Sequence, residues 1–154
     1  MNTIMNGSDL LLYYSTDEGM TFTPLAHATS HSISYNMDTR EVSDKKSGNS
    51  KAIAPGRTSF SGSADGLVTY VAGCDYHTLL GFIRNRTELM IASAQDDGAD
   101  SPDSDAVASG TPAYYTGKIY LTSVDKTAGD QDSVSFSCSF EGNGDLTPVD
   151  GTLV

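Results

Sequence analysis

Asp132-Ser-Val-Ser-Phe-Ser-Cys-Ser-Phe-Glu-Gly-Asn-Gly144 is the most regular stretch of the chain. Its apolar and hydroxyl side chains alternate without a break: Val134, Phe136, Cys138 and Phe140 on one parity, Ser133, Ser135, Ser137 and Ser139 on the other. A period of two predicts a β-strand with one buried face and one polar face. Gly142-Asn143-Gly144 tolerates positive φ and therefore ends the strand.

A second stretch, Arg57 to Asp65, repeats this pattern more loosely. Phe60 and Ala64 fall on one side, and the other side carries Ser59, Ser61, Ser63 and Asp65. A solvated strand face usually carries longer side chains, whereas these serines would make a flat, polar, uncharged surface. Two ordinary strands of a β-sandwich remain the plainer interpretation of both stretches.

The composition favours a β domain that binds no nucleic acid. The chain has 154 residues, enough for one domain with one core. Its 38% hydrophobic content, 15 glycines and absence of Trp suit an all-β domain with long loops, or one whose apolar surface is completed by neighbouring copies. The net charge of −11 excludes a grip on phosphates, which depends on Lys and Arg.

Cysteine usage and hydropathy predict a soluble protein made in a reducing cytosol. Cys74 and Cys138 provide neither a disulfide framework nor the spacing of a metal site. Cys138 lies on the apolar side of its strand, where a free thiol behaves as a small hydrophobe. We find no secretory signal near the N-terminus and no run of about 18 apolar residues that could span a bilayer.

One helix and several further strands are expected. The strands are Leu10–Tyr14, buried on both faces or at a subunit contact, Thr21–Leu25, Ile33–Met37, Leu67–Val71, Thr87–Ala94 and Ala113–Val124. The helix follows Asp75, a good N-cap, and its apolar stripe is Tyr76, Leu79, Leu80 and Ile83. Asn85 is expected to take the left-handed stop. The tail after Gly144 is too short to predict an element of its own.

Asp38 to Gly56 has few apolar residues and no sustained period, which predicts a long loop. With the flanking Arg57 it holds five of the nine basic residues, Arg40, Lys45, Lys46, Lys51 and Arg57. Three acidic residues oppose them, so this basic arm carries +2 and the remainder of the chain −13. It is either a solvated hairpin or an arm that is disordered alone and orders against the acidic surface of another copy.

Candidate catalytic and metal-binding groups are weak. His27 and His31 would share a strand face but stand about 13 Å apart, and no third ligand is placed near them. The loop from Gln95 to Pro112 clusters Asp96, Asp97, Asp100, Asp103 and Asp105 without the spacing of a calcium loop. We find no phosphate-binding glycine loop and no nucleophile elbow. The sequence therefore supports no catalysis, no cofactor and no metal.

The order of the short motifs resembles the major tail protein, or tail tube protein, of long-tailed bacteriophages. The motifs are Gly7–Tyr14, Ala26–Ile33, Ser43–Gly48, Ser59–Gly66, a helix around Tyr76–Arg84, Tyr115–Gly117 and Val134–Gly144. They cover nearly the whole chain, and their order and spacing carry the resemblance. The Asp-rich loop at 95–112 has no counterpart from which a role can be transferred.

The resemblance implies one domain over 1–154, an antiparallel β-sandwich or barrel-like fold flanked by one α-helix, with long loops. It also implies homo-hexameric rings that stack into a hollow conduit in the virion tail, assembled in the host cytoplasm. The inner strands of six copies would join into one barrel, and the arm at 38–56 would contact a neighbouring ring or subunit. Other tail proteins would bind the tube ends, DNA would pass without specific binding, and no membrane is involved.

Composition supports the same function separately, because a tube that passes DNA should not hold it. A lumen of small hydroxyls and negative charge would repel phosphates, and the serines with Asp65 are candidates for this lumen face. Alternatively, the serine faces pack against a neighbouring subunit. Other functions left open are the ring protein of a contractile secretion tube and a monomeric carbohydrate-binding or adhesin module. The latter would need clustered exposed aromatics, and the 8 Tyr are spread out.

Overall fold

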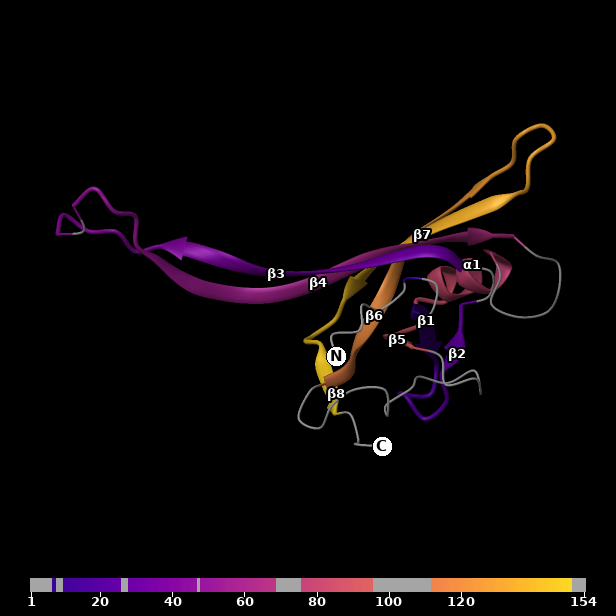
Figure 1. Cartoon of the computed structure of the whole chain (residues 1–154), viewed down its shortest axis with the longest axis horizontal. Coiled ribbons are helices and arrows are strands. Elements are labelled where there is room, and N and C mark those ends of the chain that lie inside the picture. Colours follow the sequence, from indigo (N-terminus) through magenta and orange to yellow (C-terminus); the bar gives the residue numbers. More distant parts are fainter. Residues whose placement is uncertain are drawn as a thin grey trace, which may run out of the picture.

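The computed structural model describes residues 7, 10–25, 28–46, 48–68, 76–95 and 112–150. In chain order the elements are β1 (Leu10–Ser15), β2 (Thr23–Pro24), β3 (Ala28–Glu41), β4 (Ile53–Leu67), α1 (Tyr76–Arg84), β5 (Leu89–Gln95), β6 (Pro112–Thr127), β7 (Ser135–Gly142) and β8 (Thr147–Asp150). The prediction of a mainly β domain with one helix is confirmed (Figure 1).

All the described strands belong to one antiparallel sheet of order β2-β1-β5-β6-β7-β4-β3, and β8 pairs with β6. The sheet curls so that strands from both of its ends supply one hydrophobic core, with Leu12 of β1 and Phe60 of β4 in the same cluster. In the described part of the chain no ladder joins β2 to β3, so one copy does not close its sheet into a barrel.

The alternation along β7 places its apolar side chains in the core. Phe136, Cys138 and Phe140 are buried, as are Phe60 and Ala64 of β4, which confirms the two buried faces expected from the sequence. The Cys138 thiol is free, and burial raises its pKa to about 11. It therefore stays protonated at neutral pH and packs as a small hydrophobe. Cys74 lies outside the described residues.

Strand β1 is buried on both faces, as predicted. Leu12 enters the main cluster, whereas Tyr13 packs with Ala92 and Ala94 of β5 on the opposite side. Tyr14 contacts the helix through Phe82, with ring centroids 5.8 Å apart. This strand therefore joins the two apolar layers of the domain.

The helix begins at Tyr76 as predicted, but its end differs. Asn85 still donates a helical hydrogen bond to Gly81, and it is Arg86 that takes the left-handed conformation, with φ of 53°. Arg86 N–H then bonds Ile83 and Thr87 N–H bonds Phe82, the pattern of a Schellman cap. The helical hydrogen bonds therefore continue one residue further than expected, and the left-handed residue that ends the helix is Arg86 instead of Asn85. The expected N-cap Asp75 lies outside the described residues.

Two strand predictions need correction. The tail after Gly144 does form a strand, because the first part of β6 extends past β7 and offers β8 a ladder in which Tyr115 pairs with Pro148. A partner elsewhere in the chain thus supports a strand that is too short to predict locally. Only Leu67 of the expected Leu67–Val71 strand is strand, as the last residue of β4; Val68 N–H bonds Val134, and 69–71 lie outside the described residues.

The basic arm is a projecting hairpin rather than an irregular loop. Strands β3 and β4 run far beyond the body (Figure 1), and the ladder continues through Thr39–Pro55 to Glu41–Ile53. Closer to the tip, Val42 N–H bonds Ala52 at 2.9 Å. The prediction of loop is therefore wrong at both ends of 38–56, whereas a hairpin, one of the two forms left open for the arm, is what the structure shows. The sequence of these strand ends has no hydrophobic period, because neither of their faces lies against the body.

The ring of Phe60 explains why two positions on neighbouring strands are glycine. A Cβ at Gly142 of β7 would lie 2.3 Å from the Phe60 ring, and one at Gly117 of β6 would lie 2.6 Å from it. The buried ring thus occupies the space above both glycines. Close approach, and not backbone freedom, requires glycine at these two sites.

Replacing Gly142 with Ala should destabilise the fold, because the added methyl overlaps a ring that the core holds in place. We expect a loss of about 1–3 kcal/mol, typical of overpacking, measured from urea unfolding midpoints. Gly81→Ala is the matched control: its Cβ meets nothing within 4 Å on α1. That change should stabilise the helix by roughly 0.5–1 kcal/mol. Equal midpoints for Gly142→Ala and the parent would refute the packing argument.

Candidate functional site

The two serine ladders lie side by side on one face of the sheet. Ser63 of β4 pairs with Ser139 of β7, and the flanking strands add Ser32 of β3 and Ser123 of β6 in the same line. Directly opposed residues of antiparallel strands share a face. The four neighbouring strands β6, β7, β4 and β3 therefore present one continuous polar surface.

We call this surface the hydroxyl face. It consists of Ser30, Ser32, Ser34 and Asn36 of β3; Ser59, Ser61, Ser63 and Asp65 of β4; Ser135, Ser137, Ser139 and Glu141 of β7; and Ser123, Asp125 and Thr127 of β6, with Leu67 and Tyr120 at its margins. Ser133 is exposed but precedes β7, so it is not part of the ladder.

Rows of the hydroxyl face run across the strands. One row is all serine, Ser32, Ser63, Ser139 and Ser123, and the next is Ser30, Asp65, Ser137 and Asp125. Ser32 and Ser63 hydroxyls lie 3.3 Å apart, and the Ser30 hydroxyl donates to the Asp65 carboxylate at 3.2 Å. Short side chains bonded to one another keep this surface flat.

The charged members of the hydroxyl face are Asp65, Asp125 and Glu141, all of them acidic. Two basic residues lie beside the hydroxyl face at the end nearer the arm. Arg57 is two residues before Ser59 on β4, and Lys118 is two residues before Tyr120 on β6. Lys118 is paired with Glu88 at 3.5 Å. The Glu88 pKa is lowered, first by the hydrogen bond from Asn143 and then by Lys118. The face itself is thus polar and negative.

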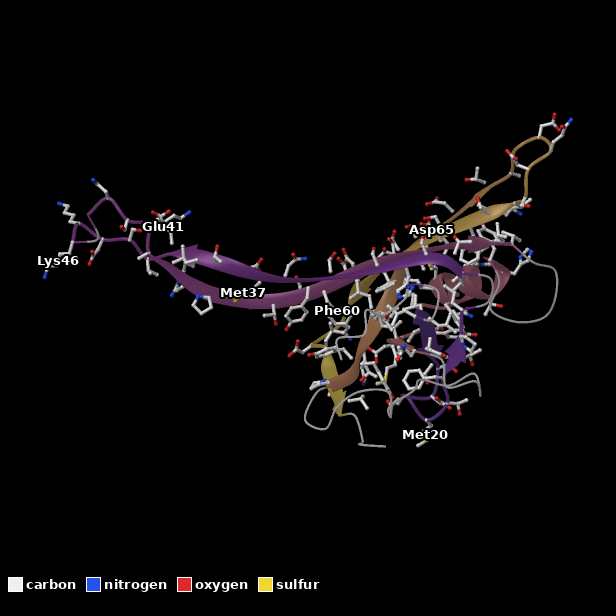
Figure 2. All side chains as sticks on the ribbon, in the orientation of Figure 1. Met20, Met37, Glu41, Lys46, Phe60 and Asp65 are labelled. Atoms are coloured by element: carbon white, nitrogen blue, oxygen red, sulfur yellow. The ribbon has the colours of Figure 1, made fainter. Side chains whose placement is uncertain are left out.

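The hydroxyl face is open, whereas the opposite face of the same strands is filled. In Figure 2, Asp65 points away from the body and Phe60 points into it. Asp65, Asn36 and Ser30 are exposed, in contrast to the buried Phe60 and Phe136. Where these strands cover the core, the hydroxyl face is therefore the side that can meet a solvent channel or another subunit.

Sequence reasoning found the ladders of β4 and β7 but missed those of β3 and β6. On β3, Ser30, Ser32 and Ser34 alternate with His31 and Ile33, a readable period of two. On β6 the register shifts between Leu121 and Ser123, so one extra residue breaks the alternation. The alternation of β6 was therefore hidden by this bulge.

The four-stranded region has two open edges. Beyond Ile119, β6 has β7 on one side, since β5 pairs with it only up to that residue and β8 only with its first part. On the far side, β3 pairs with β4 alone among the described strands. Unpaired backbone groups at such edges are a template for pairing with another chain.

The structure places the predicted arm residues along the hairpin. Lys46 lies at its tip (Figure 2), Lys45 precedes it in the same turn, and Arg40 stands opposite Ala54 in the ladder. Lys51 approaches Glu41 at 4.0 Å, and both side chains are exposed. An ion pair of this kind contributes only about 0–1 kcal/mol. The arm therefore presents its charge far from the body.

His31 lies on the core side of β3 and connects β3 to β5, two strands that no described ladder joins. Its Nε2 is 2.7 Å from the Ser93 hydroxyl of β5, and burial lowers the His31 pKa. In the described ranges no three His, Cys, Asp or Glu side chains gather as a metal site. His27 and residues 96–111, with the five aspartates of the loop, lie outside them. None of the described helices could cross a membrane.

His31 should make stability depend on pH. Its pKa in the fold lies below the ordinary 6.5, so the unfolded chain takes up the proton first. The stability contributed by the neutral ring is present above about pH 6.5 and is lost as pH falls toward the lower, folded-state pKa. We expect the urea midpoint of His31→Gln to fall less between pH 7.5 and pH 5.5 than that of the parent.

The exposed His77 of α1 offers the matched control, because His77→Gln leaves the contact between His31 and Ser93 intact. An unchanged slope in His31→Gln would show that the bridge between β3 and β5 does not sense protonation.

Comparisons with known proteins agree with this geometry. The family model for the phage tail tube protein matches residues 4–148. The fold is similar to a chain in the tail of an empty GTA (gene transfer agent) particle solved with C6 symmetry, at 19% identity and a TM-score of 0.75, covering 95% of this chain and 99% of that one.

Two further structures share the fold. A chain of the SPP1 tail tube is 16% identical, with a TM-score of 0.68 over 97% of this chain and 81% of that one. A chain of the anti-feeding prophage baseplate is 8% identical, with a TM-score of 0.65 over 96% of both chains. No curated protein matches the chain by sequence.

Proposed function

The chain belongs to the phage tail tube protein family and is a structural subunit of a tail tube, and on that premise we propose that six copies close into a ring. Rings then stack into a hollow conduit for DNA. The observation that carries the proposal is the open hydroxyl face on a four-stranded sheet with two free edges. The family match gives no support to a monomeric binding module.

Strand direction favours closure of the ring through these edges. Along β6, β7, β4 and β3 every neighbouring pair is antiparallel, so β6 and β3 run in opposite directions. Copies related by rotation about the ring axis would bring β3 of one beside β6 of the next, again antiparallel. The ring would become one continuous barrel without exposed edges. The C6 symmetry of the similar GTA tail supports six copies.

In this ring the hydroxyl face lines the lumen. The other face of the same strands is occupied by the core, which leaves the polar side for the channel. Asp65, Asp125 and Glu141 would repel the phosphates of passing DNA, and serines offer little for it to hold. The lumen residues proposed from the sequence are thereby extended by those of β3 and β6.

The family match supports a proposal for the location and the partners of the subunit. The subunit would reside in the virion tail after assembly in the host cytoplasm. It would contact other copies of itself along the tube and different tail proteins at the two ends. The basic arm, which projects away from its own body, would form the contact between rings.

Ser63→Arg tests the lumen assignment, since Ser63 lies in the middle of the all-serine row. A solvated Arg in the lumen leaves assembly intact but gives phosphates a partner, so DNA release from the particle should slow. Electron microscopy of tubes and the rate of DNA release are the measurements. Ser63→Gln, of similar length but uncharged, and Thr16→Arg, on the exposed β1–β2 turn, should behave as the parent.

Loss of tubes in Ser63→Arg with normal tubes in Ser63→Gln would instead place the hydroxyl face at a packed subunit contact, where an unpaired charge is costly. Normal tubes and normal release would refute both placements.

Reversing the charge at the arm tip tests the stacking role. Lys45→Glu with Lys46→Glu changes the arm from +2 to −2 and should repel the acidic body of the next copy. We expect rings without long tubes in sedimentation, an unchanged circular dichroism spectrum, and a smaller effect at high salt. Arg84→Glu with Arg86→Glu makes the same charge change at the end of α1 and should still give tubes.

A parent protein that sediments only as the 16.2 kDa species at every concentration would refute self-assembly itself.

A further inference from the structure

One side of the arm carries large apolar residues that its own body does not cover. Tyr35, Met37, Thr39 and Glu41 alternate on this side of β3, and Ile53 of β4 stands opposite Glu41. The exposed fractions are 50% for Tyr35, 51% for Met37 and 55% for Ile53. We call Tyr35, Met37 and Ile53 the apolar row. It lies on the side opposite the hydroxyl face, because Tyr35 pairs with the buried Phe60.

Tyr35 contacts the body at the base of the arm. Its hydroxyl donates to Asp145 at 2.5 Å, which fixes the base of the arm over the turn between β7 and β8. Met37 already lies on the projecting part of the hairpin (Figure 2), and Ile53 lies further toward the tip because it pairs with Glu41. A two-stranded hairpin alone is only marginally stable in water. The outer arm therefore needs an apolar partner that its own body does not supply.

The body has an apolar groove of a size that suits side chains such as those of Met37 and Ile53. Its volume is about 440 Å³, and its apolar lining is Leu10, Ile33, Tyr114, Tyr115 and Leu146. Tyr115 is half exposed at this groove, and burial raises the pKa of Tyr114. Because Ile33 lies beside the base of the arm on the same side as Tyr35, the arm leads away from the groove of its own chain.

A second copy of this chain is the occupant that the charges favour. The arm carries +2 and the remainder of the chain −13, so an arm is attracted to the body of another copy and the apolar row can then desolvate. We propose that Met37 and Ile53 of one copy insert into the groove beside Tyr115 of another. This inference rests on the proposed tube, in which each copy would give one arm and receive one.

Photo-crosslinking in assembled tubes tests the docking. A diazirine amino acid is placed at position 53, and light and ¹⁵N-labelled subunits are mixed before assembly. We expect crosslinks that join a light to a heavy peptide, the partner peptide containing Tyr115 or Leu146. The same probe at position 20, where Met20 is 88% exposed in the β1–β2 turn, should give no crosslink to these peptides.

The variant Met37→Asp with Ile53→Asp provides a second measurement. It should leave rings intact and raise the protein concentration needed for tubes at least about tenfold, which corresponds to ~1.4 kcal/mol per contact. Tubes with crosslinks elsewhere, or only within one isotope, would overturn the docking and leave the tube function standing. A parent chain that forms neither rings nor tubes would overturn both.

Discussion

Burial of one side of β4 and β7 is the constraint on which the rest of the structure depends. Phe60, Phe136 and Phe140 fill the core from this side, and strand geometry then turns every intervening residue outward. A slip of one residue in register would place serines in the core and phenylalanines in water. The flat polar surface is therefore a direct consequence of the packing beneath it.

Much of the fold could be predicted because this packing leaves a local trace in the sequence. The alternation of β7, the doubly buried β1 and the stripe of α1 each appear within a few residues. The projecting parts of β3 and β4 could not be predicted, since a solvated ladder imposes no hydrophobic period. Strand β8 depends on the long first part of β6, a partner far away in sequence.

The hydroxyl face was predictable in part for the same reason. Ser61, Ser63, Ser137 and Ser139 alternate with buried residues, but only strand pairing reveals that the two ladders are adjacent. The bulge in β6 removed the pattern around Ser123. The groove beside Tyr115 gave no signal, because its walls come from β1, β3, β5 and β6 and from Leu146 before β8.

The projecting arm makes each copy unequal at its two ends. An arm that enters the groove of a copy in the next ring is a heterologous contact, and along a stack of rings such contacts repeat without closing. A stack built in this way is a polar filament: its first ring leaves its grooves empty, whereas its last ring leaves its arms unoccupied. Any protein that binds one end of such a stack would therefore need a different surface from a protein that binds the other end, the one shaped like an arm and the other like a groove.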